Sequence, residues 1–167
     1  MTMIKIGEWN DLIVKREKEF GVYLGCADSD SEVLLPRKQV PNGIKTGEHI
    51  NVFIYRDSDD RLIATVNVPY ITMGKMAGLR CVGTTKIGAF MDWGLEKDLL
   101  LPFREQVRKV RPGEECLVAL YLDKSKRLCA TMKVYHYLRT DSPYEKDQKV
   151  TGTLYEISDN FGAFVAV

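Results

Sequence analysis

The chain has 167 residues, of which 45% are hydrophobic and 28% are charged, and its formal net charge at pH 7 is +1. These values are ordinary for a soluble globular protein, and near-neutral charge is weak evidence for nucleic-acid binding by the chain as a whole. No apolar run approaches the ~18 residues of a membrane helix, and Lys5, Glu8 and Asp11 interrupt any signal-peptide pattern. We therefore expect a cytoplasmic protein without a membrane partner.

An internal repeat sets the domain organisation. Residues 47–68 and 113–134 align without a gap, with ten of 22 positions identical. The match extends upstream, and a third copy begins at residues 161–165. Because a repeat of this length predicts repeated structural units, we expect two small domains and the start of a third. The expected bounds are 1–68 and 79–138 for the two domains, 69–78 and 139–147 for the linkers, and 148–167 for the truncated third domain.

The elements of each copy, taken in chain order, are all predicted strands. First strands are expected at 11–17 and 79–86, and second strands at 20–26 and 87–93, each with a glycine that we expect to mark a bulge or a tight bend. Third strands end at Pro36 and Pro102, and the segments 37–46 and 103–112 follow, with a short helical turn. Hairpins come last, pairing 49–56 with 61–68 and 115–122 with 127–135.

Five short strands in each copy, with almost no helix, predict a small closed barrel, since closure removes exposed sheet edges. The OB-fold is a five-stranded barrel of this size. The four cysteines form no C-x-x-C pair, and three of them, Cys81, Cys116 and Cys129, align with aliphatic residues of the first copy. We therefore expect buried, reduced thiols that act as small hydrophobic side chains, and no zinc or redox site.

Charge is distributed unevenly between the copies. Residues 1–68 hold nine Lys or Arg against eleven Asp or Glu, whereas residues 69–140 hold thirteen against seven. The last segment, 141–167, holds two against five. The second copy is therefore the basic one, and a polyanion would be attracted mainly to it.

Three short motifs recur in a fixed order. Residues 20–23 and 87–90 read Phe-Gly-Val-Tyr and Ile-Gly-Ala-Phe, a Gly-Glu pair stands at 47–48 and 113–114, and Asp-x-x-x-Arg spans 57–61 and 123–127. The order resembles the S1 RNA-binding domain, an OB-fold variant, and residues 150–165 resemble the opening of a third such domain. The string GAFMDWGLEKDLLLPFREQ at 88–106 is similar to the conserved virulence factor B family of bacterial S1-domain proteins. The resemblance covers nearly the whole chain.

The sequence departs from that family at two points. Pro36 and Pro102 stand where S1 domains usually place a histidine that contacts RNA, which removes one expected contact from each complete copy. Family members also continue with a complete third S1 unit and a C-terminal winged helix, so we expect this chain to be a fragment or a divergent short form. The expected fold is all-β, with tandem five-stranded S1-like OB barrels and the first strands of a third.

The candidate binding residues combine aromatic rings with cations, as single-stranded nucleic acid requires. The resemblance places Phe20, Tyr23, Phe90, Phe161 and Phe164 on the stacking face, with Arg61 and Arg127 beside them. Lys86, Arg104 and Arg108 would add phosphate contacts around the basic copy. Each assignment has an alternative: a strand aromatic can belong to the core, Asp-x-x-x-Arg can be a hairpin ion pair, and the run of cations at 104–111 can be a solvated face.

The sequence carries no P-loop, no Rossmann glycine fingerprint and no recognisable catalytic triad, and the two histidines lack ligand spacing. We expect no enzyme, no cofactor and no metal. The function expected from the resemblance is binding of single-stranded RNA with low sequence specificity, as a regulator of gene expression or translation. Further expected partners are the ribosome or the transcription and translation machinery, and a second copy of the chain through the incomplete third domain. The alternative is a protein-interaction module whose barrels do not bind nucleic acid.

Overall fold

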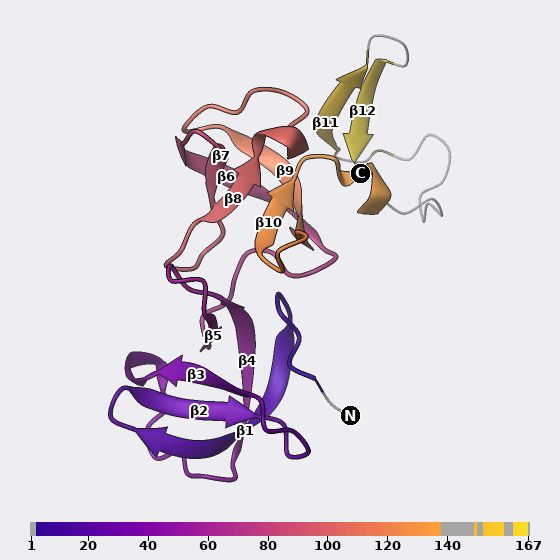
Figure 1. Cartoon of the computed structure of the whole chain (residues 1–167). Helices are drawn as coiled ribbons and strands as arrows, with labels where there is room; N and C mark the ends of the chain where they lie inside the picture. The colour runs from indigo at the N-terminus through magenta and orange to yellow at the C-terminus, as the bar shows by residue number, and fades with distance from the viewer. Residues whose placement is uncertain (1–2, 138–148, 150–151, 159–161, 167) are drawn as a thin grey trace. The chain divides into compact units, whose positions relative to one another are not determined.

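The computed structural model describes residues 3–137, 149, 152–158 and 162–166. Within these ranges the regular structure is β-strand, apart from three short 3-10 turns. The chain divides into two compact units, the first holding strands β1–β5 and the second β6–β10 (Figure 1). Each unit is built mainly from one copy of the repeat, and the second also includes the start of the third copy.

The first unit is a closed barrel. Its strands are β1 (Trp9–Lys18), β2 (Gly21–Gly25), β3 (Glu32–Pro36), β4 (His49–Arg56) and β5 (Leu62–Thr65). They follow the order β1-β2-β3-β5-β4, and β1 pairs with β4 to close the ring. A single parallel bridge, Leu34 with Ile63, joins β3 to β5. The prediction of a five-stranded OB barrel is confirmed for this copy.

The core of the barrel comes from alternate residues of its strands, because successive side chains of a strand point to opposite faces. Val22 and Leu24 point inward from β2, and Val33 and Leu35 point inward from β3. The other buried members of this cluster are Leu12, Val14, Cys26, Val52, Ile54 and Ala64. The residues between them on β2 and β3 therefore face outward.

The second unit repeats this arrangement. Its strands are β6 (Met76–Thr84), β7 (Gly88–Asp92), β8 (Leu99–Pro102), β9 (Glu115–Leu122) and β10 (Leu128–Thr131). Their order, β10-β9-β6-β7-β8, is the order of the first barrel, except that no β8–β10 pair occurs among the described residues. An OB-fold is a partly open barrel, so the second copy keeps the predicted fold class.

The cysteines are part of these cores. Cys81, Cys116 and Cys129 are exposed by 1%, 7% and 3%, and Cys26 by 6%. All four are free thiols. The prediction of buried, reduced cysteines is confirmed.

The bulge lies on a different strand from the one expected. Pairing passes from Val14 with Leu24 to Arg16 with Tyr23, so Lys15 is an extra residue of β1. The same shift occurs on β6 between Cys81 and Gly83. The bulge therefore belongs to the first strand of each copy, and the expectation of a bulge at the glycine of the second strand is wrong.

Strand boundaries also differ from prediction. β6 begins at Met76 rather than at residue 79, and Ile71, in the expected linker, is buried. The backbone N–H of Tyr70 donates to the carbonyl of Trp93 at 2.8 Å. Much of the stretch expected to link the copies is therefore packed into the second unit.

Short 3-10 turns follow the third strands, as predicted: η1 (Arg37–Gln39) and η2 (Phe103–Glu105). Gln39 Oε1 accepts hydrogen bonds from the Thr65 hydroxyl and from the N–H of Val66 at 2.9 Å. In the second unit, Glu105 Oε1 accepts a hydrogen bond from the Thr131 hydroxyl at 3.0 Å. Each turn is thereby held to the end of the fifth strand of its copy.

A third turn, η3 (Val134–Tyr137), follows β10. Beyond it, β11 (Thr153–Ser158) and β12 (Gly162–Ala166) form an antiparallel hairpin. Its register shift, between Leu154 and Glu156, is the bulge of the first two copies again. The hairpin therefore repeats the β1–β2 and β6–β7 pairs.

Candidate nucleic-acid interface

A row of four paired residues crosses the outer face of the first unit. Arg16 of β1 pairs with Tyr23 of β2, Tyr23 with Leu34 of β3, and Leu34 with Ile63 of β5. Cross-strand partners lie on the same face of a sheet, and none of the four is fully buried. The row thus offers one cation, one aromatic ring and two aliphatic side chains to a ligand.

Phe20 lies beside Tyr23 of this row. It lies in the turn between β1 and β2 and is 56% exposed. Its ring meets that of Tyr23 edge to face, with centroids 6.0 Å apart and planes at 89°, an arrangement that aromatic pairs favour. The structure therefore brings together the two first-copy aromatics that the sequence predicted, on one exposed face.

Arg16 belongs to the same group, although the sequence did not single it out. Its guanidinium carbon lies 4.1 Å from the centroid of the Tyr23 ring, within the range of a cation–π contact. Its Nε donates to Glu32 Oε2 at 3.2 Å. The bulge at Lys15 makes this possible, because it sets the register that places Arg16 opposite Tyr23.

Arg37 holds the turn that carries Phe20. Its backbone N–H donates to the Phe20 carbonyl at 2.9 Å, and its guanidinium donates to the carbonyls of Lys18 and Glu19. The same group pairs with Glu17 Oε1 at 3.0 Å. Arg37 is thus a second cation that sequence reasoning missed, and it fixes the position of an aromatic side chain.

The glycine of each aromatic motif has a packing reason. A Cβ on Gly21 would lie 2.2 Å from the carbonyl oxygen of Leu35, and a Cβ on Gly88 would lie 2.3 Å from that of Leu101. Gly21 also has φ +153°. The second and third strands of each copy therefore approach too closely for any other residue.

The corresponding face of the second unit is less polar. Phe90 pairs with Gly83 and with Leu100, so a glycine takes the position that Arg16 holds in the first unit. Ile87, in the place of Phe20, is 63% exposed, and Phe103 is 51% exposed. The N–H of Phe103 donates to the Ile87 carbonyl at 3.2 Å, as Arg37 does to Phe20. The second face keeps the geometry of the first, but a glycine and a phenylalanine, Gly83 and Phe103, take the places of Arg16 and Arg37.

Arg61 is positioned by a turn rather than by the aromatic pair. Asp57 Oδ1 accepts the backbone N–H groups of Asp59 and Arg61, both at 2.9 Å, and Asp57 Oδ2 accepts Arg61 Nε at 3.2 Å. Partial burial alone would raise the pKa of Asp57, but the N–H groups of Arg61 and Asp59 and the Arg61 charge lower it. The carboxylate is therefore a structural part of the β4–β5 turn.

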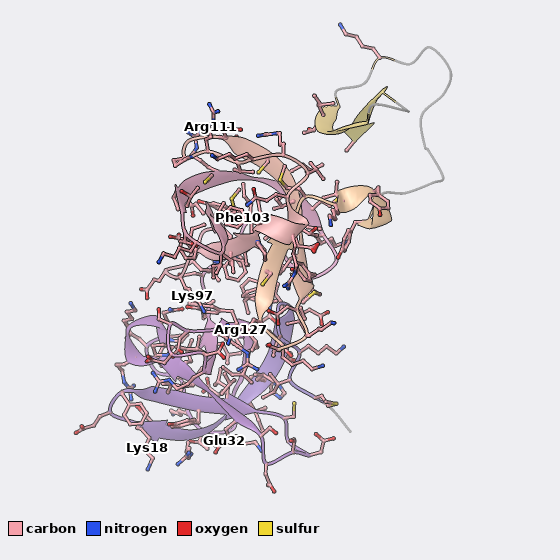
Figure 2. The ribbon with its side chains drawn as sticks, turned by 45° about the horizontal axis from the view of Figure 1, so that its top comes forward. Lys18, Glu32, Lys97, Phe103, Arg111 and Arg127 are labelled. Atoms are coloured by element: carbon pink, nitrogen blue, oxygen red, sulfur yellow. The ribbon has the colours of Figure 1, made fainter. Side chains whose placement is uncertain are left out.

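The register separates Arg61 from Phe20. β3 and β5 run parallel, with Leu34 beside Ile63, so Arg61 lies level with the start of β3. Phe20 precedes Gly21, which pairs with the end of β3 at Pro36. Lys18 and Glu32, labelled in Figure 2, mark these two ends of the face.

Arg127 occupies the equivalent turn of the second copy of the repeat, between β9 and β10. Asp123 Oδ1 accepts the N–H of Ser125 at 2.8 Å and that of Arg127 at 3.0 Å, which reproduces the pattern at Asp57. Lys126, like Asp60 in the first unit, has φ +64°. The Asp-x-x-x-Arg motif therefore builds the same hairpin turn twice.

The remaining predicted cations lie around the second unit. Lys86 is exposed in the β6–β7 turn beside Ile87, and Arg104 is exposed in η2 beside Phe103, which Figure 2 labels. Arg108 pairs with Glu114, and its hydrogen bond is the main cause that lowers the pKa of that carboxyl. Lys86 and Arg104 thus border the apolar face, whereas Arg108 is held by a carboxylate.

The third-copy aromatics cannot be placed in the same way. Phe161 lies outside the described residues. Phe164 is in β12, where its backbone pairs with Glu156. Across the residues that the structure describes, no group of three or more His, Cys, Asp or Glu is placed to hold a metal ion. In the same residues, no helix has the length and apolar character needed to cross a membrane.

Comparison with known proteins supports the repeat. A family model for the S1 domain matches residues 6–67 and 73–133, which correspond to the two units. The chain is 28% identical over 169 residues to the uncharacterized protein YitL of Bacillus subtilis, covering 95% of this chain and 55% of that protein. It is 29% identical over 120 residues to conserved virulence factor B of Staphylococcus haemolyticus, covering 68% of this chain and 40% of the relative. The chain thus spans about half the length of the relatives it matches.

A solved structure shares the fold. It is described as a multidomain protein with nucleic acid binding domains from Streptococcus pneumoniae, and the two superpose with a TM-score of 0.67. The match covers 96% of this chain and 58% of that one, at 17% identity. At this identity the likeness supports the architecture of the chain.

Proposed function

We propose, from the premise that the chain belongs to the S1 domain family, that it binds single-stranded RNA with little sequence specificity. The observation that carries the proposal is the exposed group of Phe20, Tyr23 and Arg16 on the outer face of the first unit. The wider role, regulation of gene expression or translation in the cytoplasm with the ribosome or the transcription machinery as partner, rests on family resemblance.

The chemistry of this face suits unpaired bases. A base can stack on an aromatic ring or on a guanidinium plane whatever its identity, because every base has a π-face. Phe20 offers an exposed ring, and Arg16 offers a planar cation above Tyr23. Leu34 and Ile63 continue the face with apolar contact area.

We propose that the second unit adds a weaker contact. Phe90 and Ile87 supply contact area for a base, while Lys86 and Arg104 are positioned beside them to meet phosphates. Pro36 and Pro102 each pair with the motif glycine of their copy. They cannot make the polar contact of a histidine, so each unit relies on stacking.

A protein-docking module is the second candidate. It is favoured by the second unit, where Ile87 and Phe103 expose 63% and 51% of their surface and a glycine replaces the arginine. Exposed apolar side chains that lie together mark interaction surfaces. This function would leave RNA unbound or bound without dependence on the aromatics.

Titration of the chain with an unstructured single-stranded RNA at several salt concentrations tests the proposal. We expect binding at low salt, with log K falling against log salt by roughly 0.7 for each phosphate contact. Duplex RNA of the same length should bind more weakly, because its bases are not available for stacking. Absence of measurable binding at low salt would overturn RNA binding for this chain and favour the docking module.

A further inference from the structure

Two arginines beside the first-unit aromatics, Arg16 and Arg37, are each held by a carboxylate. Arg16 Nε lies 3.2 Å from Glu32 Oε2, and Arg37 Nη1 lies 3.0 Å from Glu17 Oε1. The pairs join different strands or turns, so each carboxylate is brought to its arginine by the fold rather than by sequence proximity. The segment as a whole, residues 1–68, holds more acidic than basic residues. The face is thus aromatic and cationic, but the charges of its two arginines are each paired with a carboxylate.

This neutralisation acts differently on two kinds of polyanion. A phosphate that approaches Arg16 meets Glu32 beside it, and like charges brought together oppose binding. A base that stacks on Phe20 or above Tyr23 is uncharged and meets no such opposition. The carboxylates therefore weaken the binding of a ligand that has phosphates alone more than the binding of a ligand that also has unstacked bases.

We propose that Glu32 and Glu17 are specificity-determining residues, which make the first unit reject base-free polyanions and require exposed bases. The inference rests on the proposed function, since it assigns a selectivity to the same face. Both carboxylates act through an arginine: Glu32 through Arg16, and Glu17 through Arg37.

The repeat provides a matched control for Glu32. Asp98 stands at the corresponding position, immediately before β8, and the residue corresponding to Arg16 is Gly83. Asp98→Asn and Glu32→Gln therefore remove the same charge from equivalent places. If Glu32 acted through net charge alone, the two substitutions would have equal effects.

The experiment measures binding of two probes, inorganic polyphosphate and an unstructured single-stranded RNA, at one low salt concentration. We expect Glu32→Gln to strengthen polyphosphate binding about fivefold, the scale of one exposed ion pair, and RNA binding by less than about twofold. Asp98→Asn should change both by less than about twofold. In the background of Arg16→Gln, the gain in polyphosphate binding from Glu32→Gln should be smaller than in the unmodified chain, because part of that gain comes from freeing Arg16.

Equal gains for the two probes, or equal gains for Glu32→Gln and Asp98→Asn, would overturn the inference. Glu17→Gln is a second variant with the same expected direction, and it keeps the test decisive if Glu32→Gln alters the fold seen by circular dichroism. The polyphosphate measurements need no RNA. Failure of the unmodified chain to bind RNA therefore counts against the proposed function. The polyphosphate measurements test separately whether the two carboxylates oppose the binding of a base-free polyanion.

Discussion

The guanidinium of Arg16 lies over the ring of Tyr23, with its central carbon 4.1 Å from the ring centroid. The two residues face each other because β1 gains one residue at Lys15, which resets the pairing of β1 with β2. An exposed cation–π contact of this kind contributes about 0.5–1 kcal/mol. Its importance lies less in stability than in presenting a planar cation beside two aromatic rings.

Replacing Arg16 should weaken RNA binding in a way that depends on the planar group. We expect Arg16→Ala to lower affinity for single-stranded RNA by about 1–2 kcal/mol, because a stacking plane and a charge are both lost. Arg16→Lys should recover less than half of this loss, since an ammonium keeps the charge but cannot stack. Fluorescence anisotropy with a labelled RNA measures both. Full recovery by lysine would show that charge alone is used.

The aromatic residues give a second prediction. Phe20→Ala and Phe90→Ala should each cost about 1–3 kcal/mol in RNA binding with the fold intact. The loss should be larger for Phe20, whose ring is 56% exposed, than for the partly buried Phe90. Tyr70→Ala is the control, because Tyr70 is 62% exposed but lies before β6, outside both faces. An equal loss for Tyr70→Ala would mean that the site is elsewhere.

The fold was predictable because the residues that recur in both copies are ones that the fold requires. Gly21 and Gly88 recur because no Cβ fits against the third strand. Asp57 and Asp123 recur because each accepts two backbone N–H groups of the same hairpin turn. Because a turn or a close strand contact requires these residue types, the requirement is visible as a short motif in the sequence. Aligning the copies therefore identified the strands and their order.

The binding face was only partly predictable, because it depends on the pairing of strands. Phe20 and Tyr23 lie three apart in a recognisable motif, and their proximity could be expected. Arg16 reaches them through a one-residue bulge, whose position on β1 no residue type marks. Arg37 reaches the turn before β2 from beyond the end of β3. Neither arginine recurs in the second copy, so the repeat gave no signal for them.

The low pKa of Asp57 predicts an acid dependence of stability. Its folded pKa is below the ordinary value of 3.8, so its contribution is fully present above that pH and is lost as pH falls through the folded pKa. We expect Asp57→Asn to lower the free energy of unfolding at neutral pH by about 1 kcal/mol. The difference from the unmodified chain should disappear in acid. Denaturant unfolding at several pH values measures it.

Asp59→Asn is the control for this prediction. Asp59 also pairs with Arg61, at 3.1 Å, but its side chain is 76% exposed. An exposed ion pair contributes little, so the stability of Asp59→Asn at neutral pH should match that of the unmodified chain. Equal destabilisation by the two variants would mean that the turn depends on net charge and not on the charge of the carboxylate that accepts the N–H groups of Asp59 and Arg61.

Cys116 gives a prediction at the opposite end of the pH range. Burial, the main cause, raises the pKa of its thiol from 9.0 to about 11. The neutral thiol is favoured by folding, so its contribution to stability is present below pH 9.0 and is lost as pH rises through the folded pKa. Just below pH 9.0, iodoacetamide should label Cys116 far more slowly in the native chain than in denaturant. Equal labelling rates, read by mass spectrometry, would contradict the burial.

The motif glycines allow the sharpest test of the barrel itself. Gly21→Ala and Gly88→Ala should each lower the free energy of unfolding by about 2–4 kcal/mol, because the added Cβ would strike the backbone of the third strand. Gly83→Ala is the control, since nothing lies within 4 Å of a Cβ there, and its effect should be within about 0.5 kcal/mol.

Because Gly21 also sets the turn that carries Phe20, Gly21→Ala should weaken RNA binding even where the chain remains folded. Gly88→Ala destabilises the second unit and should leave Phe20 in place. Loss of RNA binding by both variants to the same extent, at a temperature where both are folded, would mean that the two faces act as one site.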